Sequence, residues 1–171
     1  MGVMTEPAAD ARPEAWAPED VALYRAQAPR LLALAAALAG PSEADDVVSA
    51  AVLRSFTTPG WRDVAEPAAY LTRAVVNEVR SGHRRSLRRS AREARYALGR
   101  PKADRPADHD PPDPALLAAL AHLPLRQRAV TFLTYWADLT PADVAAELGI
   151  SEGSVRKHLA RARATLRREL G

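Results

Sequence analysis

The sequence predicts an all-α protein built from two small helical domains that are joined by a linker rich in proline and aspartate. Alanine is abundant and isoleucine occurs once, at Ile150, which favours helices over strands. The 14 prolines outnumber the 8 glycines and stand at expected helix starts and in one central stretch. Hydrophobic residues make up 47% and charged residues 26% of the 171 positions, a composition typical of a globular protein.

The first domain is expected to span residues 17–98 and to follow a disordered tail at residues 1–16. Its first helix begins at Pro18, because proline suits a first helical turn and the acids after it suit the helix dipole. Its second helix should begin with a capping box at residues 42–45. Between the second and third helices we expect a turn at residues 57–60. The expected helices cover residues 18–38, 42–56 and 67–98.

Residues 99–112 alternate proline with aspartate, a pattern typical of a solvated linker. The second domain is expected to span residues 113–171, with two helices before residue 137. A helix opened by Thr140 and closed by Gly149, followed by a longer helix capped by Ser151, predicts a helix-turn-helix. Gly149 suits the positive φ of a helix end, and the Ser151 hydroxyl can accept from free amides of the next helix.

The last helix has one apolar side and one polar side. Val155, Leu159, Ala162 and Leu166 fall within a narrow arc and should pack on the rest of the domain. The opposite side is thin and basic enough to enter a major groove about 12 Å wide. Its candidate DNA-binding residues are Ser154, Arg156, Lys157 and Arg161.

The third helix also has one apolar side and one polar side. Leu71, Val75 and Val79 should form its buried side. The opposite side carries an asparagine among arginines, and asparagine can recognise adenine while arginines hold phosphates or guanine. The alternative is that the asparagine is a neutral surface residue. The candidate residues on this side are Arg73, Asn77, Arg80 and Arg84.

The charge distribution indicates a polyanionic partner. The formal net charge is +3, yet basic residues gather in two blocks, at 73–105 and 156–168. Cysteine is absent, and the four histidines have no metal-ligand or catalytic spacing, so we expect no metal, no cofactor and no enzymatic activity. The longest apolar run, residues 31–39, is too short for a membrane span, and the first twenty residues lack a signal peptide. We therefore expect a cytoplasmic protein.

Together these features resemble an extracytoplasmic-function (ECF) sigma factor of the sigma-70 family, and in particular actinobacterial members. The resemblance covers residues 20–98 and 113–170, and it is most specific from Tyr70 to Arg85 and in the second half. The residues that carry it are Ala69-Tyr70-Leu71, Asn77, Arg84-Arg85, Leu123-Pro124, Gln127-Arg128, Leu148-Gly149-Ile150-Ser151, Arg161-Ala162 and Leu166-Arg167.

The resemblance implies a region 2-like first domain, which binds core RNA polymerase and recognises the −10 promoter element, and a region 4-like second domain, which recognises the −35 element. The loop at 57–66 would correspond to the segment that captures an unstacked base. Trp61 is a candidate for stacking on that base, with packing beneath the loop as the alternative. The implied polymerase-binding residues are Asp46, Ser49, Leu53 and Arg54, although family members usually carry glutamine and an acid in place of Ser49 and Ala50.

The implied function is to direct core RNA polymerase to specific promoters, with promoter DNA and the polymerase as partners. The resemblance leaves an anti-sigma protein open as a further partner, and we expect the free chain to be a monomer. The alternative is an autonomous helix-turn-helix regulator that binds operator DNA without polymerase, a class that usually dimerises on palindromic sites. The first domain argues against it, because it contains neither a phospho-acceptor sheet nor a ligand pocket.

Overall fold

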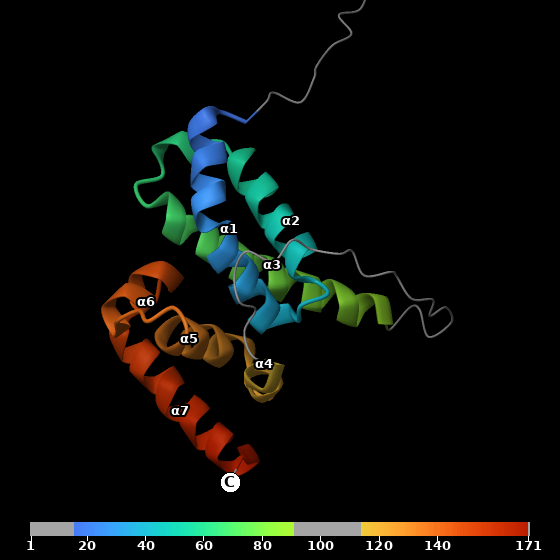
Figure 1. Cartoon of the computed structure of the whole chain (residues 1–171), viewed down its shortest axis with the longest axis vertical. Coiled ribbons are helices and arrows are strands. Elements are labelled where there is room, and N and C mark those ends of the chain that lie inside the picture. The colour runs from blue at the N-terminus through green and yellow to red at the C-terminus, as the bar shows by residue number, and fades with distance from the viewer. Residues whose placement is uncertain (1–15, 91–113, 171) are drawn as a thin grey trace, which may run out of the picture.

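The computed structural model describes residues 16–90 and 114–170, with side chains described for 16–82 and 114–168. Within these ranges the chain forms α-helices and one short 3-10 helix and contains no strand, which confirms the predicted all-α class (Figure 1). The expected linker at 99–112 and all but the last residue of the expected tail at 1–16 lie outside the described residues.

The first half consists of α1 (Pro18–Ala39), α2 (Ala44–Phe56), the 3-10 helix η1 (Trp61–Asp63) and α3 (Pro67–Ser90). The end of α1 is as predicted, because Gly40 takes a φ of 98° and donates its amide to the carbonyl of Ala36. The three long helices pack pairwise on each other. Their shared core is aliphatic and small, and it is centred on Leu31, Leu34, Ala35, Val48, Val52, Leu71 and Val75.

The capping box expected at residues 42–45 is wrong. The residue before α2 is Glu43, which has a helical conformation (φ −103°, ψ −9°), and α2 starts without any side-chain cap. A capping side chain needs an extended backbone at the cap position to reach the free amides. Here a turn leads directly into the helix, since the Glu43 amide already donates to the carbonyl of Gly40.

The second half consists of α4 (Pro114–Ala121), α5 (Leu125–Tyr135), α6 (Pro141–Leu148) and α7 (Glu152–Leu170). Helix α7 packs on α4, α5 and α6. The buried centre of this half contains Leu120, Leu123, Val130, Phe132, Leu133, Val144 and Val155.

The two halves are in contact. Helix α1 lies against α4 and α5, and α6 lies against α3, so the helix-turn-helix sits beneath the first half in Figure 1. The buried apolar residues of both halves form one continuous cluster. Among the described helices, none combines the length and apolar character that a membrane crossing requires.

Candidate nucleic-acid interface

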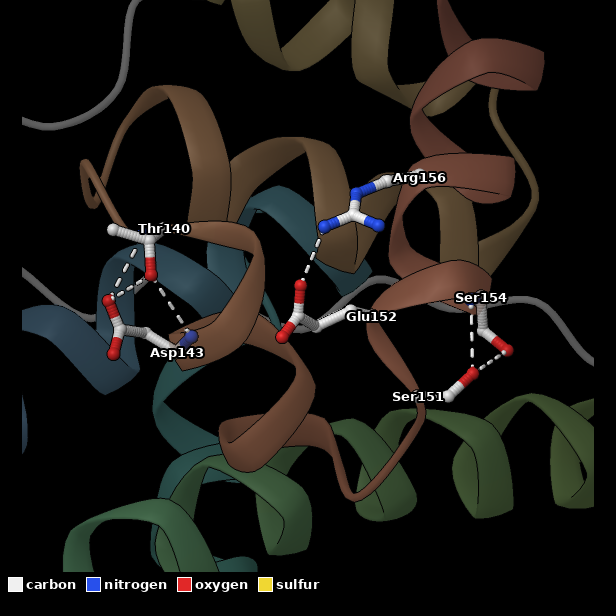
Figure 2. A network of polar contacts seen from close by, with 6 residues as sticks. All are labelled: Thr140, Asp143, Ser151, Glu152, Ser154 and Arg156. Atoms are coloured by element: carbon white, nitrogen blue, oxygen red, sulfur yellow. Dashed lines mark hydrogen bonds and ion pairs between the residues drawn. The ribbon is translucent and has the colours of Figure 1, made fainter.

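The first helix of the helix-turn-helix, α6, opens at Thr140 as predicted, and it does so with a reciprocal cap between Thr140 and Asp143. The Asp143 amide donates to the Thr140 hydroxyl at 3.2 Å, and the Thr140 amide donates to the Asp143 carboxylate at 3.2 Å (Figure 2). Helix α6 ends at Gly149, whose φ of 63° and ψ of 41° lie in the left-handed region. The predicted role of glycine at this turn is therefore confirmed.

Helix α7 begins at the predicted cap. The Ser154 amide donates to the Ser151 hydroxyl at 3.2 Å, and the two serine hydroxyls lie 2.9 Å apart (Figure 2). One turn into α7, the Arg156 guanidinium pairs with the Glu152 carboxylate at 2.7 Å. Arg156 is therefore already held by an acid on its own helix face. Ser154 is half-buried and uses its hydroxyl within the cap.

The two sides of α7 are as predicted. Val155, Leu159 and Ala162 are buried, and Leu166 is half-buried. Arg156, Lys157 and Arg161 are exposed, and we call these three the outer face of α7.

Two features beside the outer face of α7 have no signal in the sequence: a contact between Tyr135 and Arg163, and the partial burial of His158. Tyr135, at the end of α5, is 58% exposed. The Arg163 guanidinium lies over the Tyr135 ring, and its Cζ is 5.7 Å from the ring centroid. Arg163 also donates from Nε to the Tyr135 hydroxyl at 2.8 Å. The contact joins residues 28 positions apart, and no spacing rule relates them.

His158 is half-buried on α7. Burial lowers the pKa of its imidazole, and the nearby cations Arg126, Arg161 and Lys157 lower that pKa further. The imidazole is therefore neutral at pH 7. The positive potential of this surface comes from its arginines and Lys157.

Helix α3 also divides as predicted on its buried side, where Leu71, Val75 and Val79 are at most 8% exposed. On the other side, Asn77 and Arg80 are exposed, and Arg73 is half-buried. We call Arg73, Asn77 and Arg80 the basic face of α3. The fourth predicted residue, Arg84, lies on α3, but its side chain is outside the described ones.

Trp61 packs beneath the loop in this structure, which is the alternative to an exposed ring that stacks on a base. Its side chain is 6% exposed, and its indole Nε1 donates to the carboxylate of Asp20 at 2.8 Å. The ring packs against Phe56 and Tyr70, with centroid separations of 4.9 and 5.6 Å. A ring enclosed in this way has no free surface for a base in this conformation, so its role here is to fix the loop onto α1.

The exposed face of α2 contains the four residues for which the family resemblance implies polymerase binding. Asp46, Ser49 and Arg54 are exposed, and Leu53 is 54% exposed although it is apolar. Arg54 also pairs at 2.8 Å with Glu78, a buried acid of α3. Arg54 therefore joins α2 to the helix segment that contains Asn77.

No group of three or more acidic or histidine side chains that could hold a metal ion occurs among the described residues. The two basic faces offer cations and the amide of Asn77, and the exposed face of α2 offers polar and charged groups around one exposed leucine. Such groups can bind nucleic acid and protein.

Residues 114–166 match the family described as Sigma-70, region 4. The chain is 34% identical over 143 residues to the ECF RNA polymerase sigma factor SigL of Mycobacterium tuberculosis, with 81% of each chain covered. It is 31% identical over 134 residues to the RNA polymerase sigma-E factor of Streptomyces coelicolor, covering 76% of this chain and 73% of that protein. SigM of Mycobacterium tuberculosis is 35% identical over 130 residues, which are 75% of this chain but 65% of SigM.

A solved structure has the same fold. It is the sigma factor RpoE of Bartonella quintana in complex with the anti-sigma factor NepR, with a TM-score of 0.69 over 89% of this chain and 96% of that one. The two are 22% identical, so this likeness concerns the fold. The sequence identity to SigL and sigma-E, by contrast, covers most of both chains and therefore shows the family, as the sequence resemblance implied. The chain belongs to the extracytoplasmic-function RNA polymerase sigma factors.

Proposed function

We propose that this chain directs core RNA polymerase to specific promoters by recognising two DNA elements. The observation that carries the proposal is the presence of two separate basic helix faces on one chain, each opposite a well-packed apolar side. The outer face of α7 follows a helix-turn-helix, and the basic face of α3 contains an asparagine between arginines. Two recognition helices on a monomer suit a bipartite site such as a −35 and a −10 element.

In this proposal α7 enters the major groove at the −35 element. Ser154, Arg156, Lys157 and Arg161 lie in the first half of α7, where a recognition helix contacts base edges. Arg156 would exchange its Glu152 carboxylate for DNA when it binds. Residues 113–171 would act as the region 4-like domain and residues 17–98 as the region 2-like domain, linked by residues 99–112.

At the −10 element, Asn77 would recognise a base, while Arg73, Arg80 and Arg84 would hold phosphates. The face of α2 with Asp46, Ser49, Leu53 and Arg54 would bind core polymerase. Catalysis would then belong to the polymerase, and this chain would act in the cytoplasm as an initiation factor. Because the Bartonella quintana protein was solved with an anti-sigma factor, a protein of that class is a further proposed partner.

Transcription in vitro with purified core RNA polymerase tests the proposal. Core polymerase alone should not start from genomic promoter fragments, whereas addition of this chain should give discrete start sites. The alternative, an autonomous regulator, requires tight binding of a dimer to palindromic DNA without polymerase. That behaviour, together with no stimulation of core polymerase, would contradict the proposal.

Arg156→Ala and Lys157→Ala should each weaken promoter binding without loss of the fold, since both side chains point outward. A residue that contacts a base should cost about 1–3 kcal/mol and relax the preference at one −35 position. The measurement is the affinity of the reconstituted holoenzyme for a library of −35 variants. The matched control is Arg25→Ala, which removes an exposed arginine of α1 that belongs to neither basic face. Unchanged affinity for both α7 variants would mean that another surface contacts the DNA.

Asn77→Ala and Arg80→Ala should separate base recognition from charge, because the two exposed residues lie on one helix face. Arg80→Ala should lower affinity for all sequences and reduce the slope of log affinity against log salt by about 0.7–0.9 per lost phosphate contact. Asn77→Ala should keep that slope and reduce discrimination at one −10 base by roughly 1–3 kcal/mol. The assay is open-complex formation on a −10 library at several salt concentrations. An Asn77→Ala holoenzyme with unaltered base preference would make this side chain a neutral surface residue.

A further inference from the structure

Helix α3 contains a buried acid that belongs to none of the proposed functional sets. Glu78 lies three positions after Val75 and seven after Leu71, so it falls on the apolar side of the helix, and it is buried there. A buried carboxylate costs free energy unless a cation or hydrogen-bond donors compensate its charge. Because an apolar side chain could pack at this position without that cost, the acid calls for an explanation beyond the core.

The cation that compensates Glu78 is Arg54, in the last turn of α2. The Arg54 Nη1 lies 2.8 Å from the Glu78 Oε2. The two side chains differ in exposure, since that of Glu78 is 9% exposed and that of Arg54 is 61% exposed. A guanidinium has five N–H donors, and one ion pair leaves several of them for other partners. The buried carboxylate therefore holds the end of an arginine that is otherwise largely at the surface.

The backbone around Arg54 is held as well. Carbonyls in the last turn of a helix lack intrahelical partners, and here two threonine hydroxyls supply them. The Arg54 carbonyl accepts from the Thr58 hydroxyl at 2.7 Å and from the Thr57 hydroxyl at 3.3 Å. The carbonyl of the neighbouring Leu53 also accepts from Thr57, at 2.8 Å. Arg54 is thus fixed at its carbonyl and at its guanidinium, directly beside the exposed Leu53.

Glu78 lies beside both proposed binding faces of the first half. It lines a cavity of about 1110 Å³ together with Asp46 of the polymerase-binding face. It also lines a smaller cavity of about 300 Å³ together with Arg54 and Asn77. Because α2 packs on α3, an ion pair at this point fixes the end of α2 against the part of α3 that contains Asn77.

We propose that Glu78 is a positioning residue for polymerase binding, whose carboxylate presents the Arg54 guanidinium in the orientation that core polymerase contacts. The inference rests on the proposed polymerase-binding role of this face of α2. Binding immobilises long side chains at an interface, and each one that was free before binding lowers the affinity. An arginine that Glu78 already holds loses less freedom, so the ion pair strengthens the contact. If polymerase had to take Arg54 away from Glu78, the pair would weaken binding instead.

The first test is a double-mutant cycle. Glu78→Gln removes the charge with little change of shape and should weaken the binding of core polymerase about three- to tenfold. Arg54→Ala should weaken it by at least as much. Because Glu78 acts through Arg54, the double variant should bind like Arg54→Ala alone. The measurement is equilibrium binding of labelled core polymerase, with circular dichroism as the check on folding. An unchanged or raised affinity of Glu78→Gln, or losses that multiply in the double variant, would overturn the inference.

The matched control for this cycle is Glu147→Gln. Glu147 of α6 is also a largely buried acid that pairs with an arginine, since it lies 2.8 Å from Arg30 of α1 and the two side chains are 15% and 26% exposed. Neither residue belongs to the proposed polymerase-binding set. The control should bind core polymerase within about twofold of the wild type. An equal loss in Glu147→Gln and Glu78→Gln would make the effect one of general stability and would contradict a positioning role.

The second test uses the wild-type chain without polymerase, so it does not depend on the folding of any variant. NMR relaxation and solvent exchange of the arginine Nε–H groups measure how firmly each guanidinium is held. The Arg54 group should be ordered and exchange slowly, whereas that of Arg25, an exposed arginine of α1, should be mobile. An Arg54 group as mobile as that of Arg25 would overturn the inference. Failure of the wild-type chain to bind core polymerase would instead contradict the proposed function.

Discussion

Replacing Leu53 by aspartate is expected to lower the affinity of this chain for core RNA polymerase by roughly 100-fold or more while the fold stays intact. Leu53 is 54% exposed on α2, so its side chain contributes little to the core. In a protein interface, however, an apolar side chain at the centre becomes desolvated. An aspartate there would leave an unpaired carboxylate buried on binding, which costs about 3 kcal/mol or more.

The measurement is equilibrium binding of labelled core polymerase to the variant, with circular dichroism as the check on folding. Leu116→Asp is the matched control, because Leu116 is 38% exposed and lies on α4, in the other half of the chain. The control should bind polymerase like the wild type. Equal affinities for the Leu53 variant and the wild type would move the polymerase contact to another surface.

Local chemistry explains which parts of the fold the sequence could predict. The ends of α6 and the start of α7 depend on Thr140, Gly149 and Ser151, and each acts on amides or dihedral angles within a few residues of itself. The buried side of α3 follows from helical periodicity, which needs no knowledge of the rest of the chain. These predictions were confirmed because nothing distant competes with them.

The failed capping box shows the opposite case. Residues 42–45 resemble the pattern, but a capping side chain acts only if the backbone before the helix is extended. The short connection from Gly40 into α2 leaves Glu43 helical instead. The conformation of that connection depends on how α1 and α2 pack, which the four-residue pattern does not contain.

Residues distant in the sequence determine the position of Trp61. The sequence offered a tryptophan in a loop and left stacking on a base or packing beneath the loop as alternatives. Its indole donates to Asp20, which is 41 positions away in the chain. A buried carboxylate that accepts from the indole and pairs with Arg62 at 3.1 Å fixes the loop on α1. No local pattern relates these residues, so only the tertiary fold shows that Trp61 packs beneath the loop in this structure.

The arginine contacts between the two halves could not be predicted from the sequence either. Periodicity placed Arg73 on the side of α3 opposite its core, and that is where it lies, but its guanidinium reaches the last turn of α6. A sequence shows where cations stand on a helix and not which carbonyl each one reaches. Nothing in the sequence indicates that Arg30, Arg73 and Arg128 join the two halves, as all three do.

Arg128→Ala is expected to lower the free energy of unfolding by about 3 kcal/mol. One guanidinium satisfies the carbonyls of Leu38, Ala121 and Leu123, and burial lowers its pKa without removing its charge at neutral pH. A hydrogen bond to a charged group contributes about 1.5–3 kcal/mol, and a buried carbonyl left without a partner adds a further cost. For a chain of this length the loss corresponds to a fall in Tm of roughly 6–12 °C.

Thermal and urea unfolding followed by circular dichroism provide the measurement, and two neighbouring changes sharpen it. Arg128→Lys should recover only part of the loss, because a single ammonium cannot span three carbonyls in the way that a planar guanidinium can. Arg126→Ala removes an exposed arginine two positions away and should change stability by less than about 0.5 kcal/mol. If Arg128→Ala were no less stable than Arg126→Ala, the carbonyls at the end of α1 would be satisfied by water, and the two halves would be held together by Arg73 and the Arg30–Glu147 pair instead.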